Sequence, residues 1–110
     1  MERDRTTQRI RDFEGRVVRL TPERLRHILE HPEMENMAGT IEETLGAPER
    51  VVQSISDPEA RLYYRLCRGT VVGDKLLCIV VKVRGDDAFV LTAYLTDAFK
   101  KGAVLWPKKL

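Results

Sequence analysis

The sequence predicts an α+β fold in which two N-terminal helices pack on one face of a roughly four-stranded antiparallel sheet. Apolar residues recur at spacings of three and four in the first half of the chain, which is the helical period, and alternate with polar residues in the second half. Glycine, proline and aspartate clusters separate the alternating segments, as in hairpins. A chain of 110 residues has the size of one domain with a modest core.

The N-terminal part begins with charged residues that lack a clear period. We therefore expect residues 1–15 to be a flexible or helical lead-in and residues 16–110 to form the single folded domain. Residues 16–20, with the sequence R-V-V-R-L, are predicted to form a short strand at the start of this domain.

Two helices are predicted after that strand. Thr21 can cap the free N–H groups of the first helix, and Pro22 suits its first position. Pro32 ends this helix near His31, because the residue before a proline avoids the helical conformation. The second helix is predicted over residues 37–45, with an apolar face that would cover the sheet.

Strands fill the rest of the chain, at residues 51–55, 61–67, 75–83 and 88–96. Pairing the most apolar sets across both hairpins predicts one apolar face for the helices and one open face. The open face would carry Arg65 beside Thr92 in one row, and Cys67, Cys78 and Tyr94 in the next.

Composition excludes several classes of protein. The net charge of +2 gives no general attraction for nucleic acid, so any such function needs a local patch. No apolar run reaches the ~20 residues that span a bilayer, so we expect no membrane partner. The N-terminus lacks the apolar segment of a signal peptide, which favours a cytoplasmic protein. Oligomeric state stays open.

The order of the motifs resembles a known family. The series T-P-E-R, H-I-L-E-H-P-E-M, I-E-E-T-L, D-P, R-L-Y-Y-R, L-C-I-V-V-K-V, A-F-V-L-T-A-Y-L-T and K-K-G covers roughly residues 16–105. It is similar to the phage-type members of the barnase–EndoU–colicin–RelE-like nuclease superfamily, the BECR fold. The resemblance implies metal-independent RNA cleavage by a toxin-like or phage-associated ribonuclease. It also implies RNA as substrate, no cofactor, and a cognate inhibitor protein as a partner.

Cleavage of RNA through its own 2′-hydroxyl requires a base, an acid and groups that stabilise the phosphorane charge. His27 and His31 are the only histidines and are candidates for the base and the acid. The family places a helix histidine, a basic residue on an early strand and a hydroxyl residue on the last strand in the site. By resemblance, these positions are His27, Arg65 and Thr92.

Three further residues are predicted to bind the substrate. Lys82 could hold a phosphate together with Arg65, and Tyr94 could stack on a base or donate a hydrogen bond. Lys100, which follows the last predicted strand, could contact the backbone of a bound RNA.

Other interpretations of the same residues are open. His27 and His31 lie on one polar helix face, which solvation alone explains, and their spacing also suits half of a zinc site. No third ligand is evident, so no metal is expected. The domain could instead be a non-catalytic RNA- or protein-binding domain that keeps the nuclease fold, or a structural domain. The helices should cover the opposite face of the sheet, so the histidines would have to reach the site around a sheet edge.

Overall fold

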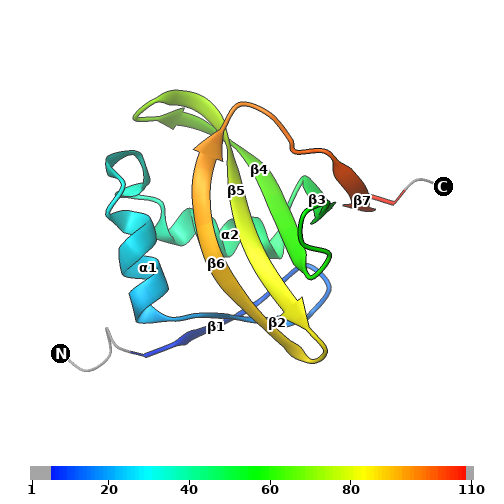
Figure 1. Cartoon of the computed structure of the whole chain (residues 1–110). Coiled ribbons are helices and arrows are strands. Elements are labelled where there is room, and N and C mark those ends of the chain that lie inside the picture. Colours follow the sequence, from blue (N-terminus) through cyan, green and yellow to red (C-terminus); the bar gives the residue numbers. More distant parts are fainter. Residues whose placement is uncertain (1–5, 109–110) are drawn as a thin grey trace.

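The computed structural model describes residues 6–108 and shows a seven-stranded mixed sheet with two short helices (Figure 1). The strands lie in the order β1-β2-β6-β5-β4-β3-β7. All neighbours are antiparallel except β2 and β6, which are parallel and pair at Arg19 and Phe89. The strands span β1 Gln8–Arg11, β2 Val17–Leu20, β3 Arg50–Ser54, β4 Ala60–Thr70, β5 Gly73–Arg84, β6 Asp87–Thr96 and β7 Gly102–Trp106.

The helices lie between β2 and β3 in the chain: α1 is Pro22–Leu29, the 3-10 turn η2 is Pro32–Met34, and α2 is Ala38–Gly46. Thr21 caps α1, because its Oγ1 accepts the N–H of Arg24 at 3.2 Å, and Pro22 occupies the first turn. The predicted helix start is therefore confirmed.

The predicted fold, two N-terminal helices on a four-stranded antiparallel sheet, is wrong. β1 and β7 extend the sheet at its two edges, and β2 introduces a parallel pair. β1 escaped prediction because an edge strand needs few apolar residues: only Ile10 of β1 is buried. β7, with the sequence G-A-V-L-W, is apolar throughout, and five residues without alternation give no strand period. Of the expected lead-in, residues 8–11 form this strand, and residues 1–5 lie outside the described residues.

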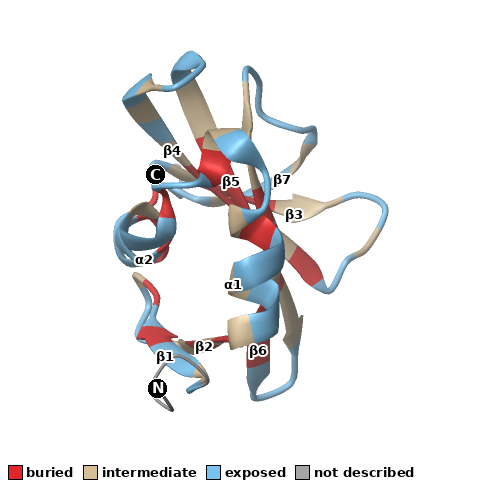
Figure 2. Cartoon of the chain, turned by 90° about the vertical axis from the view of Figure 1, so that its left-hand side faces the viewer, coloured by how far each residue is buried: buried red, intermediate tan, exposed pale blue. Residues whose placement is uncertain are grey.

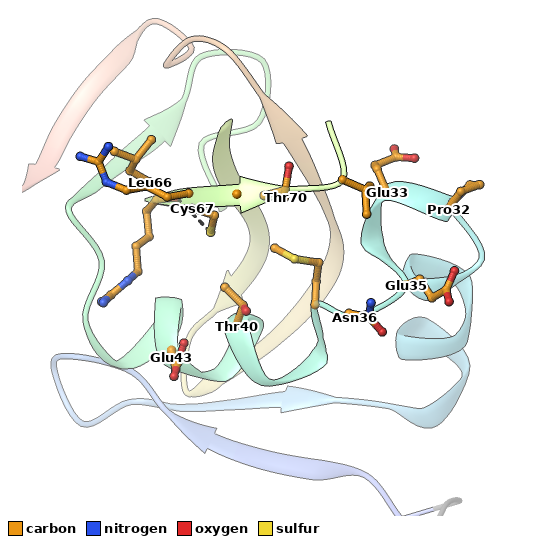
Figure 3. A pocket seen from close by; sticks show the side chains of 14 residues that line it. Pro32, Glu33, Glu35, Asn36, Thr40, Glu43, Leu66, Cys67 and Thr70 are labelled. Carbon is orange, nitrogen blue, oxygen red and sulfur yellow. Dashed lines mark hydrogen bonds between the residues drawn. The ribbon is translucent and has the colours of Figure 1, made fainter. Parts of the chain in front are cut away.

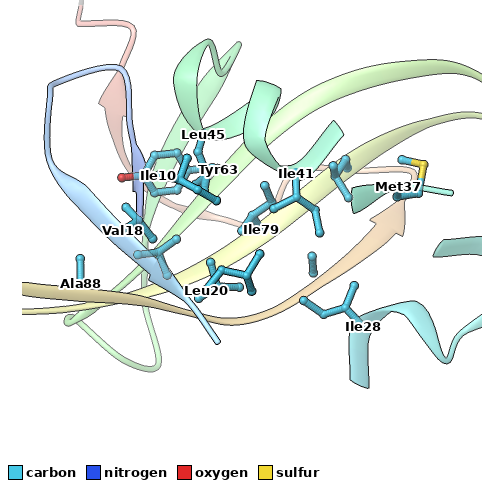
Figure 4. Packing of buried hydrophobic residues seen from close by; sticks show 14 of the residues in the cluster. Ile10, Val18, Leu20, Ile28, Met37, Ile41, Leu45, Tyr63, Ile79 and Ala88 are labelled. Atoms are coloured by element: carbon cyan, nitrogen blue, oxygen red, sulfur yellow. The ribbon is translucent and has the colours of Figure 1, made fainter. Parts of the chain in front are cut away.

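The main core lies between the helices, the β1–β2 hairpin and one face of the sheet (Figure 4). Figure 2 shows α2 on one side of the strands, with buried residues of β5 and β6 beneath α1. Burial of this apolar surface is the main source of stability. The buried members are Ile10, Val18, Leu20, Ile28, Met34, Met37, Ile41, Leu45, Val51, Tyr63, Leu77, Ile79, Val81, Ala88, Val90 and Ala93.

The register of β4 differs from the prediction by three residues. Val80 lies between Leu62 and Thr92, and Cys78 lies between Tyr64 and Tyr94. An odd shift turns every side chain of the strand to the other face. Arg65 instead pairs with Leu77, whose side chain lies in the main core. Arg65 and Thr92 are therefore on opposite faces of the sheet, and the predicted rows are wrong.

The cause is a second core on the face that was expected to be open. Val52, Leu62, Tyr64 and Cys78 are buried there. The segment 97–101, which we call the strap, runs from β6 across the sheet to β7 (Figure 1). The strap packs on Tyr64 of this second core through Phe99 and through the N–H of Lys100. Both faces of β4 and β5 are therefore apolar, and alternation alone cannot tell which set faces the helices.

Candidate functional site

A groove of about 620 Å³ lies on the strap side of the sheet, and we call it the open-face groove. Its floor is formed by β4, β5 and β6, one wall by the β3–β4 loop and the other by the end of the strap. This volume is in the range of small-molecule and cofactor sites. The lining residues are Ser54, Ile55, Ser56, Asp57, Ala60, Leu62, Val80, Leu91, Thr92, Tyr94, Lys100 and Lys101.

A bulge in β6 shapes one end of the floor. The pairing of β5 with β6 shifts between Val80 and Val81, so that Leu91 is the extra residue before Thr92. Bulges bend a strand and redirect the neighbouring side chain. Thr92 is exposed and lines the groove, where its hydroxyl can donate or accept a hydrogen bond.

Tyr94 forms the aromatic part of the floor and is half-buried. Burial and the neighbouring Cys78 raise the pKa of the Tyr94 hydroxyl well above its usual value. Burial also raises the pKa of Tyr64 to about 12, although the N–H donated by Lys100 opposes this. Both hydroxyls are therefore protonated at neutral pH, and the floor carries no negative charge from tyrosine.

Two lysines of the strap supply positive charge at the rim. In residues 6–108 neither Lys100 nor Lys101 forms an ion pair. The Lys100 Nζ lies 5.9 Å from the centre of the Tyr94 ring, within reach of a cation–π interaction. An anionic group above Tyr94 would therefore meet Lys100, with Lys101 in the same groove, while the one carboxylate of the lining, Asp57, is bound to Lys82.

Lys82 lies on the same face but is already occupied. Its Nζ lies 2.5 Å from Asp57 Oδ2 and 3.4 Å from Glu59 Oε1. The hydrogen bond to Asp57 raises the pKa of Lys82 and lowers that of Asp57. Lys82 therefore holds the β3–β4 loop in place and builds the wall of the groove, rather than offering a free charge to a phosphate.

Arg65 lies away from this groove, on the face that carries the helices. Its Nη1 donates to the carbonyl oxygen of Ala47 at 2.8 Å, and it lines a separate cavity with Glu43 of α2. The pairing of Arg65 with Thr92 in one phosphate site, which the resemblance implied, is therefore not present. The physical reason is the shifted register of β4.

Neither histidine reaches the open-face groove. His27 is 75% exposed, and its Nδ1 lies 3.7 Å from Glu30 Oε1. His31 is exposed and precedes η2 as its N-cap. The side chain of Arg24, on the same helix, reaches the edge of β6, where its Nη1 donates to the carbonyl oxygen of Leu91 at 3.4 Å. The polar side of α1 therefore flanks the β6 edge without lining the groove.

Sequence reasoning identified Thr92, Tyr94 and Lys100, which the structure brings together, and missed Lys101, Ser54 and Ser56. The doubled lysine of K-K-G was the available signal for Lys101. The serines gave no signal, since they come from a loop that only the folded chain places beside β6. The hydroxyl oxygens of Ser54 and Ser56 lie 3.2 Å apart at the groove wall.

Residues 6–108 contain no group of three histidine, cysteine, aspartate or glutamate side chains that could hold a metal ion. The cysteines do not face each other as the predicted register implied: Cys67 pairs with Lys75, and Cys78 lies on the other face opposite Tyr64. No helix among these residues is long and apolar enough to cross a membrane.

Comparisons with known proteins found no relative. No protein-family model matches the chain, and neither the curated proteins nor the solved structures contain a significant match. The resemblance to the BECR nucleases therefore stays a prediction, and a function has to be argued from the groove itself.

Proposed function

We propose that this chain is a single-stranded RNA-binding domain that uses the open-face groove. One observation carries the proposal: Lys100 lies over the ring of half-buried Tyr94, and Lys101 lines the same groove, and neither lysine has an ion-pair partner among residues 6–108. Proteins that bind single strands combine a positively charged groove for the backbone with aromatic side chains on which bases stack.

Each part of the groove suits one part of a nucleotide. Tyr94 and the apolar side chains of Leu62 and Val80 offer a surface for a base. Lys100 and Lys101 lie where the phosphates of that strand would pass. The hydroxyls of the opposite wall can bond to a ribose 2′-hydroxyl, which is the group that separates RNA from DNA.

Binding to a labelled mixed-sequence RNA of roughly 12 nucleotides would test the stacking role. Tyr94→Leu should weaken binding about 5- to 150-fold, because stacking on an aromatic side chain contributes ~1–3 kcal/mol. Tyr94→Phe keeps the ring and should bind nearly as well as the unchanged protein. Equal affinities of Tyr94→Leu and the unchanged protein would exclude the groove as the base site.

Salt dependence would test the role of the strap lysines. Lys100→Ala with Lys101→Ala should reduce the slope of log affinity against log salt by about 1.4, because each phosphate contact to a single strand contributes ~0.7. Arg9→Ala with Arg26→Ala removes two exposed charges elsewhere and is the matched control. A similar loss of slope in both double variants would mean that net charge, and not the groove, attracts the RNA.

RNA cleavage is a second candidate, favoured by the contact of Arg24 with Leu91. This contact holds Arg24 of α1 at Leu91 of the β6 edge, next to Thr92 in sequence, and His27 lies one turn further along the helix, exposed to solvent. An RNA that crosses the β6 edge would have to span both places, with His27 as the base and Thr92 as the donor to the phosphate, without Arg65.

Incubation of RNA with the protein and a metal chelator, followed by analysis of the ends, would test cleavage. New 2′,3′-cyclic phosphate ends that disappear with His27→Ala and persist with Glu30→Gln would support it. Intact RNA that still binds would leave the chain as a binding domain.

A further inference from the structure

We propose that the chain has a second binding site, where an extended basic segment of a partner protein adds as a strand to the free edge of β4 above α2. This site is on the other side of the sheet from the open-face groove. It does not depend on RNA binding.

The outer edge of β4 has a strand partner over only half of its length. β3 pairs with β4 as far as Arg50 and Tyr64, while β4 itself continues to Thr70. The Glu49 N–H donates to the carbonyl oxygen of Tyr64 at 2.8 Å, and the Glu49 carboxylate accepts the N–H of Leu66 at 3.3 Å. In residues 6–108 no strand lies beside that edge beyond this point.

The backbone groups of this edge can therefore pair with an added chain. Every second residue of an edge strand turns its N–H and C=O outward, so the outward-facing residues of this edge are Tyr64, Leu66 and then Arg68. The side chain of Glu49 accepts one of these N–H groups, that of Leu66, in the position where a neighbouring strand would otherwise offer a carbonyl oxygen. Edges of this kind bind extended peptides through main-chain hydrogen bonds.

A cavity of about 480 Å³ opens directly beside this edge, between the β4–β5 hairpin and the helices (Figure 3). Leu66 and Cys67 line it from β4, and Met37, Thr40 and Glu43 line it from the helical side. A strand placed here would have β4 on one side and α2 on the other. Side chains alternate along a strand, so one set would enter the cavity and the other would point away.

Charge selects a basic segment. Glu33, Glu35 and Glu43 line the cavity and form no ion pair among the described residues. Of the two arginines of the cavity, Arg68 lies 3.7 Å from Asp74, whereas Arg65 donates to the neutral carbonyl of Ala47 and keeps its charge. Three unpaired carboxylates therefore face one guanidinium, and the net charge of the cavity is negative, which is complementary to lysine or arginine side chains.

The tip of the hairpin adds an apolar contact. Val71 is 73% exposed and Val72 is 50% exposed, and Val71 lines the cavity. Adjacent β-branched residues left in water at the end of a projecting hairpin favour contact with a partner. The segment that fits would alternate basic and apolar residues.

A short peptide of alternating lysine and valine is the probe. Its affinity would be measured by fluorescence anisotropy, and its position by amide chemical-shift changes in the full chain. The amides of Leu66 and Arg68 should shift. The same peptide with alternate N-methylated residues should bind at least tenfold more weakly, because it cannot complete the ladder.

Two triple variants test the charge. Glu33→Gln/Glu35→Gln/Glu43→Gln should weaken binding roughly tenfold, and Glu30→Gln/Glu42→Gln/Asp86→Asn, which removes exposed carboxylates outside the cavity, should bind unchanged. The proposal would be overturned by equal affinity of the two triple variants, by equal binding of a glutamate–valine peptide, or by shifts confined to other amides. Absence of binding would overturn it as well.

Discussion

The two faces of the sheet are both partly buried, but by different means. On one face, helices and the β1–β2 hairpin enclose a continuous core, and on the other a strap packs on Tyr64 at one end of a cluster of four buried residues. Two adjacent tyrosines show the contrast. Tyr63 donates to Asp12 Oδ2 at 2.6 Å inside the main core, whereas Tyr64 accepts the N–H of Lys100 at 2.9 Å beneath the strap.

This difference teaches where a small domain can place a binding site. The helix-covered face packs tightly and carries most of the apolar burial. The strap closes only one end of the other face, and Phe99 fastens it there by an edge contact with Tyr64 at 4.9 Å between ring centres. The uncovered end becomes the open-face groove. Binding residues are commonly found on loops that a rigid scaffold positions in this way.

The largest expected effect is loss of a main-core side chain. Ile79→Ala should lower the free energy of unfolding by ~2–5 kcal/mol, because Ile79 is fully buried and its removal leaves a cavity. Val80→Ala, the next residue on the strap side, should cost clearly less, since Val80 is half-buried. Denaturant unfolding of both variants checks this. Equal losses of unfolding free energy would show that the two faces do not differ in how tightly they are packed.

Removal of the buried carboxylate comes next. Asp12 Oδ1 accepts the backbone N–H groups of Glu14 and Arg16, both at 2.9 Å, and Oδ2 accepts the Tyr63 hydroxyl. Asp12→Ala leaves that hydroxyl buried without an acceptor and should cost about 2–3 kcal/mol. Tyr63→Phe removes only one bond and should cost about 1 kcal/mol. Thermal unfolding would show the order, and a larger loss for Tyr63→Phe would contradict it.

The strap side can be disturbed at the start of β7. A Cβ on Gly102 would lie 2.1 Å from the carbonyl oxygen of Gln53 and 2.7 Å from Val52 Cγ1. Gly102→Ala should therefore separate β7 from β3 and cost about 1–3 kcal/mol, with a change in Trp106 fluorescence. Gly39→Ala on α2 meets nothing within 4 Å and is the control. An unchanged spectrum for Gly102→Ala would show that β7 does not depend on this approach.

The smallest effect is the pH response of the groove wall. The pKa of Asp57 is held below its usual 3.8 by the hydrogen bond from Lys82. Its contribution to stability is therefore present above pH 3.8 and is lost as pH falls through the lower folded value. Lys82→Met should destabilise the chain at neutral pH and converge with the unchanged protein in acid. Lys101→Met, without an ion pair, should show no such convergence in unfolding midpoints.

The positions of most elements followed from local sequence. Thr21 and Pro22 defined the start of α1, and alternation located the long strands, because capping and period depend on neighbouring residues only. β1 did not, since this edge strand buries only Ile10, and β7 did not, since its short apolar sequence has no alternation. The face assignment of β4 failed for a similar reason: with Leu62 and Tyr63 both buried, its pattern has no polar side to mark the surface.

The candidate site was predicted in part. Thr92, Tyr94 and Lys100 meet in one groove because they are close in sequence along β6 and the strap. An error in the predicted pairing of β6 would therefore shift all three by the same amount and leave them close to one another. Arg65 was separated from them because it belongs to another strand, whose register depends on contacts distant in the sequence. The histidines lie outside the groove, since they belong to α1 and the turn after it, which dock on the helix side beside the β6 edge.

The sequence by itself determined the N-cap of α1, the hairpins and the alternation of side chains, all of which arise from interactions over a few residues. The tertiary structure alone decided which side of β4 meets the helices and where the strap crosses. Those outcomes depend on competition between two apolar faces, and only the complete set of long-range contacts resolves it, with Tyr63 held by Asp12 on one side and Tyr64 by Lys100 on the other.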